Sequence, residues 1–267
     1  MGVSPSHPDG LLGCEFTKAV IYTEEATARA ALMEKHAELL LAKGTLRLME
    51  TRIVARDVVV ITFSFPARLK LIPGGHVRIS GKRISRNYTP FHITDSSFSI
   101  AVKQYPKGAV SRDIYSAKTG TFFRVAGPLE PFFTVVGVRF DVLWLIGGGT
   151  GIAPMYSMAR SCAESRTCAK IVLLGCFRDG GDSILCPQMA QLMAEFPQLV
   201  ESVVVLSRSD EQGLLGMKTM TGRFCAAHAA LLPKPSQAVI CGPPGFDGAV
   251  TDVLASVHLF EEHIAVL

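Results

Sequence analysis

The sequence lacks a hydrophobic stretch long enough to cross a membrane, although hydrophobic residues make up 48% of it. A spanning helix needs about 20 consecutive apolar residues. The longest uncharged run, residues 142–159, approaches that length but has four glycines and Pro154 in its middle. Such a run predicts a buried strand, a glycine loop and the beginning of a helix. We therefore expect no transmembrane span.

Clusters of basic residues, cysteine pairs and catalytic sets are also missing. The 27 Lys and Arg against 23 Asp and Glu are spread along the chain, which argues against a nucleic-acid partner. The seven cysteines form no C-x-x-C pair and follow no signal peptide, so we expect free thiols in a reduced, cytoplasmic protein. No Ser-His-Asp set and no cluster of metal ligands is evident, and no metal site is expected.

The first segment that is present, residues 1–44, predicts a tail followed by a helix. Residues 24–43 are helix formers with acidic residues at the start and Gly44 after the end. We expect this helix to dock on the body of the protein; binding to a partner is the alternative. The chain begins Met-Gly-x-x-x-Ser, the pattern for N-myristoylation of Gly2. The alternative is an unmodified tail. Acylation would attach the protein weakly to the cytosolic face of a membrane.

Two segments of different texture follow. Residues 45–138 contain six short β-rich runs separated by Gly and Pro, which predicts an antiparallel barrel or sandwich, with one helical patch at residues 112–117. In residues 139–267, four apolar strands alternate with helical stretches, which predicts a parallel sheet with helices on both faces. Ligands bind such a sheet at the carboxyl ends of its strands.

Two polar constellations lie at strand ends of the first segment. Arg86, Tyr88 and Thr89 combine a guanidinium that can bind phosphate with a Tyr on the same side of the strand. Lys103 and Tyr105 precede a turn at Gly108 that leads to Ser111 at a helix start, where backbone N–H groups favour an anion. Taken alone, the Arg86 group could be an ordinary polar strand end, and the Lys103–Ser111 group could be an ordinary Ser-capped helix.

Two further motifs follow strands of the second segment. The Gly147–Pro154 stretch, G-G-G-T-G-I-A-P, allows close approach of a ligand to the backbone but does not match the G-x-G-x-x-G dinucleotide fingerprint. The motif C-G-P-P at Cys241 makes a stiff turn that holds this Cys at the carboxyl edge of the sheet. The alternatives are a structural glycine turn and an inert buried Cys.

In this order, the four motifs resemble those of the ferredoxin–NADP reductase superfamily, most closely its cytochrome-b5 reductase branch. The resemblance covers residues 45–267 and implies an FAD-binding β-barrel domain at residues 45–138 and a Rossmann-like NAD(P)H-binding α/β domain at residues 139–267. It implies hydride transfer from nicotinamide to flavin N5, which needs alignment rather than a strong acid or base. Relatives are mostly monomers.

The resemblance also assigns residues. Arg86 is expected at the FAD pyrophosphate, Tyr88 at the flavin, and Thr89, followed by Pro90, at the reactive edge of the flavin. The FAD-side positions that remain are Val102, Lys103, Tyr105, Gly108, Ala109, Val110 and Ser111. On the nicotinamide side the matching positions are Gly148, Gly149, Thr150, Gly151, Pro154, Cys241, Gly242 and Pro243. Thr89 and Cys241 are the catalytic candidates because they flank hydride transfer. Phe91-His92, and Val266-Leu267 at the end, depart from the pattern of relatives.

The nucleotide donor is ambiguous in the sequence. Asp179 and Asp182 follow the second α/β strand, where an acidic residue accepts a hydrogen bond from the ribose 2′-hydroxyl of NADH. Ser207 and Arg208 resemble the pair with which NADPH users hold the 2′-phosphate, and Arg178 is nearby. We expect NADH, with NADPH as the alternative.

The chain has no C-x4-C-x2-C run and no haem module, so reduced flavin must pass electrons to another molecule. A cytochrome-b5-like haem protein is the expected acceptor, and Lys70, Arg78, Lys82 and Arg83 are candidates for a basic docking patch. Three alternatives remain: the reductase component of an oxygenase, a quinone or dye reductase, and a non-catalytic flavin-binding module.

Overall fold

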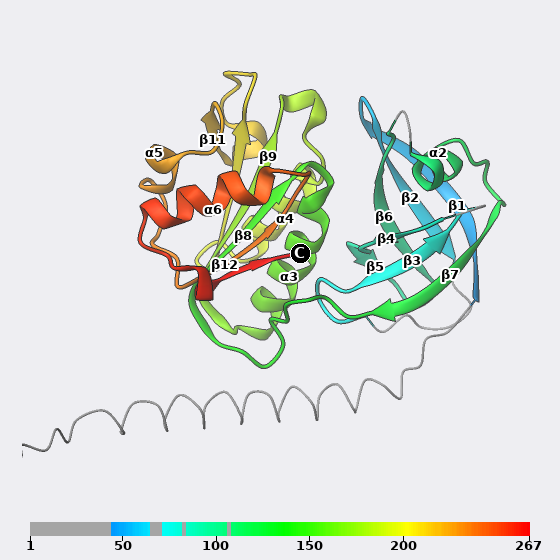
Figure 1. Cartoon of the computed structure of the whole chain (residues 1–267), viewed down its shortest axis with the longest axis horizontal. Coiled ribbons are helices and arrows are strands. Elements are labelled where there is room, and N and C mark those ends of the chain that lie inside the picture. The colour runs from blue at the N-terminus through cyan, green and yellow to red at the C-terminus, as the bar shows by residue number, and fades with distance from the viewer. Residues whose placement is uncertain (1–43, 65–70, 82–83, 106–107) are drawn as a thin grey trace, which may run out of the picture. The chain divides into compact units, whose positions relative to one another are not determined.

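A computed structural model describes residues 44–64, 71–81, 84–105 and 108–267. The predicted N-terminal helix, the Gly2 pattern, and Lys70, Lys82 and Arg83 lie outside the described residues. Two sheets make up the described part of the chain, one antiparallel and one parallel (Figure 1). The predicted fold class is therefore confirmed for this part.

The antiparallel sheet has seven strands in the order β4-β3-β7-β1-β2-β6-β5. They are β1 (Gly44–Ala55), β2 (Val58–Ser64), β3 (His76–Ser80), β4 (Ser85–Tyr88), β5 (His92–Ile93), β6 (Ser97–Lys103) and β7 (Phe122–Leu129). Alternate residues point inward, and the sheet encloses a core that includes Ile61, Phe63, Ile79 and Ile100. The helix α2 (Ala109–Tyr115) adds Val110 and Ile114 to this core.

The parallel sheet has the order β11-β10-β9-β8-β12-β13. Its strands are β8 (Phe140–Gly148), β9 (Cys168–Phe177), β10 (Val200–Leu206), β11 (Lys218–Thr221), β12 (Gln237–Cys241) and β13 (Ile264–Val266). Four helices accompany them: α3 (Ile152–Ser165), α4 (Cys186–Glu195), α5 (Ala226–Ala229) and α6 (Phe246–Ser256). The short 3-10 turns are η1 (Gly149–Gly151), η2 (Gly180–Asp182), η3 (Leu214–Gly216) and η4 (Glu261–His263).

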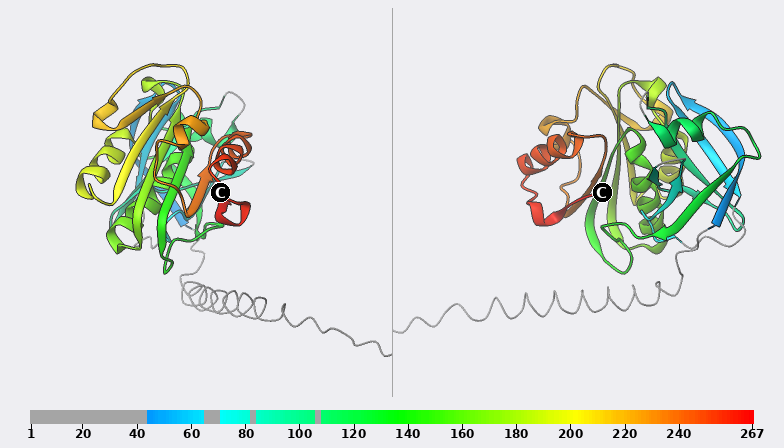
Figure 2. Two further views of the ribbon diagram at one scale, coloured as in Figure 1. Left: turned by 90° about the vertical axis from the view of Figure 1, so that its left-hand side faces the viewer. Right: turned by 45° about the vertical axis from the view of Figure 1, so that its right-hand side comes forward.

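Helices cover both faces of this sheet because its strands are apolar on both sides. On one face, Leu143 and Leu145 of β8 pack with α3 and α4. On the other face, Trp144 and Ile146 pack with α5 and α6. Figure 2 shows the sheet between these two sets of helices. The predicted parallel sheet with helices on both faces is confirmed.

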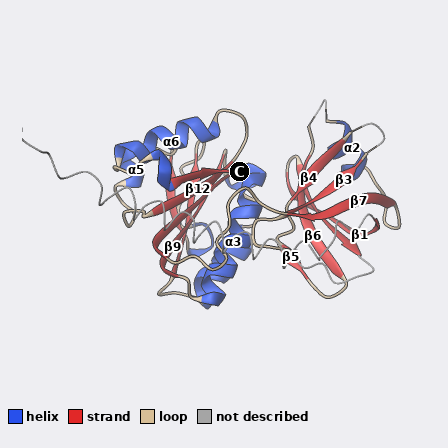
Figure 3. Cartoon of the chain, turned by 60° about the horizontal axis from the view of Figure 1, so that its bottom comes forward, coloured by secondary structure: helices blue, strands red, loops and turns tan. Residues whose placement is uncertain are grey.

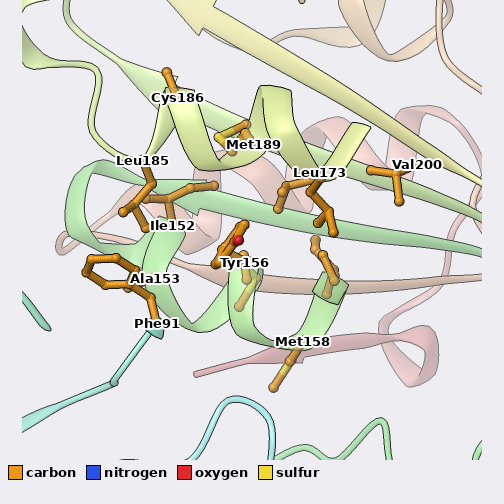
Figure 4. Packing of buried hydrophobic residues seen from close by; sticks show 14 of the residues in the cluster. Phe91, Ile152, Ala153, Tyr156, Met158, Leu173, Leu185, Cys186, Met189 and Val200 are labelled. Atoms are coloured by element: carbon orange, nitrogen blue, oxygen red, sulfur yellow. The ribbon is translucent and has the colours of Figure 1, made fainter. Parts of the chain in front are cut away.

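The first lobe (residues 44–135) and the second lobe (residues 140–267) share one apolar cluster. Val58 and Val60 of β2, Ala101 of β6 and Phe91 belong to the cluster that contains the buried residues of α3. Figure 3 shows α3 on the side of the parallel sheet that faces β5 and β6, and Figure 4 shows Phe91 beside Ala153. The outward face of the first lobe thus supplies part of the core of the second.

Several predicted elements differ from those observed. The run of residues 85–93 forms two strands at opposite edges of the sheet, because Thr89, Pro90 and Phe91 cross from β4 to β5. One of the helical stretches expected in residues 139–267, residues 222–232, forms a helix only at α5, since Gly222 has a φ of +96° and the Phe224 ring packs against Trp144. The short strands β11 and β13 were not predicted.

Candidate functional site

The edge strand β4 carries the first group of predicted residues. Arg86 and Tyr88 lie on the same side of the strand, opposite Ile79 and Val77 of β3. Arg86 is exposed, and its guanidinium donates a hydrogen bond to the Ser85 carbonyl at 2.9 Å. Burial raises the pKa of Tyr88 to about 12, so its phenol stays protonated and can donate a hydrogen bond. Thr89 is half-buried directly after it.

The turn before α2 forms a second group next to Tyr88. Tyr105 is half-exposed and acts electrostatically on Tyr88 together with Arg86, which places the three side chains near one another. A Cβ on Gly108 would lie 2.3 Å from the Ser111 Oγ, so the close approach of this turn to the hydroxyl requires glycine. Ser111 is buried in the first turn of α2. Gly108, not Ser111, is the N-cap of α2, which corrects the Ser-capped alternative.

The remaining predicted FAD-side positions differ from this group. Val102 and Val110 are buried in the core of the first lobe, so only their backbone could contact a ligand. Ala109 is exposed at the start of α2. The Lys103 Nζ lies 3.2 Å from the Asp57 carboxylate, and Lys103 lines a cavity at the strand ends of the second lobe together with Asp57 and Val58 of the first.

The turn from β8 to α3 meets the end of β12. A Cβ on Gly147 would lie 2.4 Å from the Ile152 Cα, and one on Gly151 would lie 2.1 Å from the Cys241 carbonyl oxygen. Gly149 has a φ of +54°, which favours glycine. Pro154 is buried in the first turn of α3, where it needs no N–H partner. Glycine is required at these positions because the turn after β8 lies against its own helix start and against the backbone at the end of β12.

Cys241 is the last residue of β12 and pairs with Gly147 in the sheet. Burial raises the pKa of its thiol to about 11, so it is neutral at physiological pH. Gly242 follows, and a Cβ there would lie 2.2 Å from the Phe246 ring, while Pro243 lies close to Gly148. The chain turns from β11 back across β8 to β12, so Cys241 and the glycine turn flank the point where strand order reverses, the usual ligand position in such sheets.

A cavity of about 510 Å³ opens at these strand ends. Its wall includes residues predicted from sequence: Lys103, Gly148, Gly149, Thr150, Asp182, Ser207 and Pro243. It also includes residues that were missed as site residues: Asp57, Val58, Arg178 (noted only as a neighbour), Arg223, Phe224 and Phe246. Arg223 follows the unpredicted strand β11. The only sign of it in the sequence is a cationic residue directly after Gly222. Arg208 is not among the lining residues; its backbone N–H donates to the Arg178 carbonyl at 2.7 Å.

Asp182 is the buried acid of this cavity. It is 9% exposed, and the Arg178 Nε donates a hydrogen bond to its Oδ2. Its Oδ1 is buried and has no hydrogen-bond partner. A buried carboxylate oxygen without a partner is costly, and a ligand hydroxyl is the group that would satisfy it.

A second, larger cleft of about 1010 Å³ lies between β1, β2, β5 and β6 on one side and α3 and α4 on the other. Its wall is mostly hydroxyl, amide and mixed charge, including Thr62, Ser99, Ser157 and Gln191. Pro90 and Phe91, which follow Thr89, also line it. Within the described ranges, no helix is long and apolar enough to span a membrane, and His, Cys, Asp and Glu form no group of three that could hold a metal ion.

Comparison with known proteins identifies both lobes. Residues 45–133 match the family model for the oxidoreductase FAD-binding domain, and residues 145–252 match that for the oxidoreductase NAD-binding domain. NADH-cytochrome b5 reductase 1 of Lodderomyces elongisporus is 31% identical over 221 residues, 76% of this chain and 71% of that protein. The protein of the same name from Debaryomyces hansenii is 30% identical over 212 residues, 74% and 72% of the two chains.

Solved structures share the fold. The cytochrome b5 reductase domain of Ulva prolifera nitrate reductase superposes with a TM-score of 0.73 at 21% identity, covering 85% of this chain and 97% of that one. A ferredoxin NADP+ reductase from Neisseria gonorrhoeae with bound FAD and NADP gives a TM-score of 0.68 at 15% identity, covering 84% and 98%. At these identities the likeness concerns the fold alone.

Proposed function

This chain belongs to the NADH-cytochrome b5 reductase family of FAD- and NAD-binding oxidoreductases, and we propose that it passes electrons from NADH through FAD to a cytochrome-b5-like haem protein. When bound, FAD accepts a hydride from NADH at flavin N5 and releases the two electrons singly, which lets a one-electron acceptor use a two-electron donor. The roles that follow concern the residues of this chain.

The residues around β4 and α2 fit FAD. Arg86 is an exposed cation with no carboxylate partner among the described residues, as a pyrophosphate ligand would require. Gly108 allows the turn to approach the hydroxyl of Ser111, a buried residue in the first turn of α2. Tyr88 provides a half-buried ring with a protonated hydroxyl beside Arg86. Arg86, Tyr88, Tyr105, Gly108 and Ser111 would therefore hold the dinucleotide, with Thr89 and Pro90 next to the flavin.

The cavity at the strand ends fits a nicotinamide nucleotide. The Asp182 Oδ1, which has no hydrogen-bond partner, is the reason for proposing NADH rather than NADPH. A ribose 2′-hydroxyl can donate to that oxygen, whereas a 2′-phosphate would bring negative charge to a buried carboxylate. The two cations beside this carboxylate already have acidic partners: Asp182 and Asp57 share the Arg178 guanidinium, and Arg56, whose Nε lies 4.0 Å from the Asp182 Oδ1, pairs with Asp179. Ser207 lines the same cavity but Arg208 does not, which weakens the alternative of an NADPH site built on that pair.

Gly149, Thr150 and Cys241 would align the nicotinamide. Gly149 and Thr150 line the cavity, and Cys241 pairs in the sheet with Gly147 at the start of the same turn, so a flat ring bound over this turn would lie beside these residues. Because the Cys241 thiol is neutral and buried, it can exclude water beside the ring without adding charge. Hydride transfer needs no proton from this residue. We assign Cys241 and Thr89 to the two sides of the transfer.

A basic face on the first lobe supports an acidic protein as acceptor. Arg47, Arg78 and Arg124 point outward from three adjacent strands, β1, β3 and β7, and all are exposed. None of them forms an ion pair with another described residue, and the outward positions of β3, β4 and β7 carry no acid in the described residues. Arg78 donates to Asn87 of β4, the strand whose other side carries Arg86 and Tyr88. Such a face steers an acidic haem protein toward the flavin strand.

Attachment to a membrane is a separate part of the proposal. From the pattern at the start of the sequence we infer N-myristoylation at Gly2, which would place the protein on the cytosolic face of a membrane, and from the family resemblance we infer a monomer. One acyl chain gives weak, reversible binding. Coexpression with an N-myristoyltransferase and intact-mass measurement would show one added myristoyl group, and the Gly2→Ala variant should lack it. An unmodified mass in the parent chain would remove this part.

The catalytic proposal is tested by adding oxidised cytochrome b5 and NADH to the FAD-loaded protein. We expect reduction of the haem that depends on both FAD and NADH. Rapid reduction of a dye without any reduction of the haem protein would instead favour a quinone or dye reductase. If NADH leaves the flavin oxidised, the protein is a flavin-binding module.

A further inference from the structure

Six charged side chains form a row of alternating sign where the β1–β2 turn and the end of β6 meet the loop after β9. In order they are Lys103, Asp57, Arg178, Asp182, Arg56 and Asp179. The ion pairs along the row are Lys103–Asp57 at 3.2 Å, Arg178–Asp57 at 3.7 Å, Arg178–Asp182, Arg56–Asp182 at 4.0 Å and Arg56–Asp179 at 2.6 Å. We call these six residues the charge row. Lys103, Asp57 and Arg56 belong to the first lobe, and the other three belong to the second.

The first four members of the row line the nucleotide cavity, and the last two, Arg56 and Asp179, do not. Arg56 and Asp179 are therefore the part of the row that can be changed without removing a group from the cavity wall. They nevertheless contact the wall, since the Arg56 Nε lies 4.0 Å from the Asp182 carboxylate. That distance is to Oδ1, the acceptor proposed above for the ribose, so Arg56 is a second cation beside this oxygen although it makes no hydrogen bond to it.

The loop after β9 is shaped to admit the Arg56 side chain. A Cβ on Gly181 would lie 3.4 Å from one Arg56 guanidinium nitrogen and 3.3 Å from the Asp179 Oδ1, so glycine leaves space for this pair. The Asp179 carbonyl accepts hydrogen bonds from the Asp182 N–H and from the Ser183 hydroxyl, at 3.1 and 3.0 Å. Asp179 is thus fixed to the same turn that carries Asp182, and Arg56 ties that turn to the first lobe.

We propose that Arg56 and Asp179 are positioning residues for the nicotinamide nucleotide, acting through Asp182. Their ion pair holds the η2 turn against the β1–β2 turn and keeps the Asp182 carboxylate directed at the ribose. This inference rests on the proposed function, because it assumes that the cavity binds the nucleotide. Neither residue lines the nucleotide cavity, so their loss should weaken nucleotide binding only through Asp182 and should leave FAD in place.

Simple electrostatics makes a different prediction, which allows a sharp test. The nucleotide carries a negatively charged pyrophosphate, so removal of a nearby carboxylate should strengthen its binding and removal of a cation should weaken it. Positioning by the ion pair requires weaker binding in both cases. Asp179→Asn therefore separates the two explanations by the sign of its effect.

The experiment measures the Kd of NAD+ for the FAD-loaded protein by titration calorimetry, with stopped-flow reduction by NADH in parallel. Arg56→Gln and Asp179→Asn should each raise Kd about two- to five-fold, the range expected for an exposed ion pair, at an unchanged limiting reduction rate and FAD content. The double variant should be no worse than either single one, and Arg56→Lys should recover most of the affinity. The difference from the parent should shrink in high salt. Arg52→Gln, at an exposed Arg of β1 that forms no ion pair with another described residue, is the matched control.

A lower Kd for Asp179→Asn, or equal Kd values for parent and both single variants, would overturn the positioning role while leaving the proposed function intact. If the parent protein neither binds NAD+ nor is reduced by NADH, the proposed function fails and this inference fails with it. FAD content and circular dichroism confirm folding of each variant, and Arg56 tolerates substitution because its side chain is 61% exposed.

Discussion

Single residues divide here into those fixed by packing and those left free for a ligand. Cys241 belongs to the first group: burial raises the pKa of its thiol to about 11, and it ends a strand in the core of the second lobe. Arg86 belongs to the second, since its only described partner is the neighbouring Ser85 carbonyl. An unpaired, exposed cation contributes little to the free energy of folding. The role of Arg86 is therefore to bind a ligand.

Replacement of Arg86 by Ala should weaken FAD retention because it removes a charge-assisted hydrogen bond. The expected loss is about 1.5–3 kcal/mol, or roughly ten- to 150-fold in Kd. Flavin content after gel filtration and titration of the apoprotein with FAD measure it. Arg78→Ala, on the opposite face of the same strand pair, is the control and should keep its FAD. Full FAD occupancy in Arg86→Ala would remove Arg86 from the site.

The same Arg78→Ala variant has its own expected effect on the acceptor. Loss of one cation from the basic face should raise the KM for cytochrome b5 several-fold at low salt, and the effect should fade as salt increases. Reduction of the flavin by NADH should not change. An unaltered KM at low salt would place the acceptor on another surface.

Replacement of Cys241 by Ala should slow flavin reduction by NADH while FAD stays bound, because the nicotinamide loses a neighbour that aligns it. We expect a decrease of about ten-fold or more in the limiting rate, equivalent to about 1.4 kcal/mol. Since the raised pKa keeps this thiol neutral, the parent rate should show no titration of Cys241 between pH 6 and 9. Stopped-flow traces at several pH values check both points, and an unchanged rate in Cys241→Ala would exclude the role.

At the scale of elements, the tightest structural requirement is the turn from β8 to α3. A Cβ on Gly151 would lie 2.1 Å from the Cys241 carbonyl oxygen, a backbone atom that cannot move without shifting β12. Gly151→Ala should therefore destabilise the protein by about 1–3 kcal/mol and impair nucleotide binding. Urea unfolding of the FAD-loaded protein measures this free energy.

Gly248→Ala is the matched control for that prediction. Gly248 lies exposed in α6, and a Cβ there would have nothing within 4 Å. Alanine favours a helix over glycine by about 0.8–1 kcal/mol, so this variant should be slightly more stable than the parent. If Gly151→Ala unfolds at the same urea concentration as Gly248→Ala, the turn is not as closely packed as described.

Long apolar strands were predictable, and short elements were not. β8 and β9 are buried on both faces, so their continuous Val, Leu and Ile runs identify them. β11 reads Lys-Thr-Met-Thr and exists because it pairs with β10, a contact that local sequence does not encode. The break at Thr89–Phe91 arises from the crossing between two sheet edges. Motifs located the glycine turn and Cys241, but only the fold brought Asp57, Arg178 and Arg223 to the same cavity.

At the scale of the whole described chain, two kinds of contact join the lobes. The apolar contact runs from Val58, Val60 and Phe91 to α3, and the charge row lies beside the nucleotide cavity. The apolar part is insensitive to salt, whereas exposed ion pairs weaken as salt screens them. Nucleotide affinity should therefore decrease in salt more than FAD retention or the free energy of unfolding.

The central claim is that NADH reduces an FAD held by this chain, and an anaerobic absorbance titration tests it most directly. The purified, FAD-loaded protein is recorded alone, then with NADH, and in a second sample with NADPH. The account predicts a flavin spectrum that low concentrations of NADH bleach and that NADPH bleaches only at much higher concentration. Bleaching by NADPH first would contradict the role of Asp182, and a protein that holds no flavin after FAD is supplied would contradict the account as a whole.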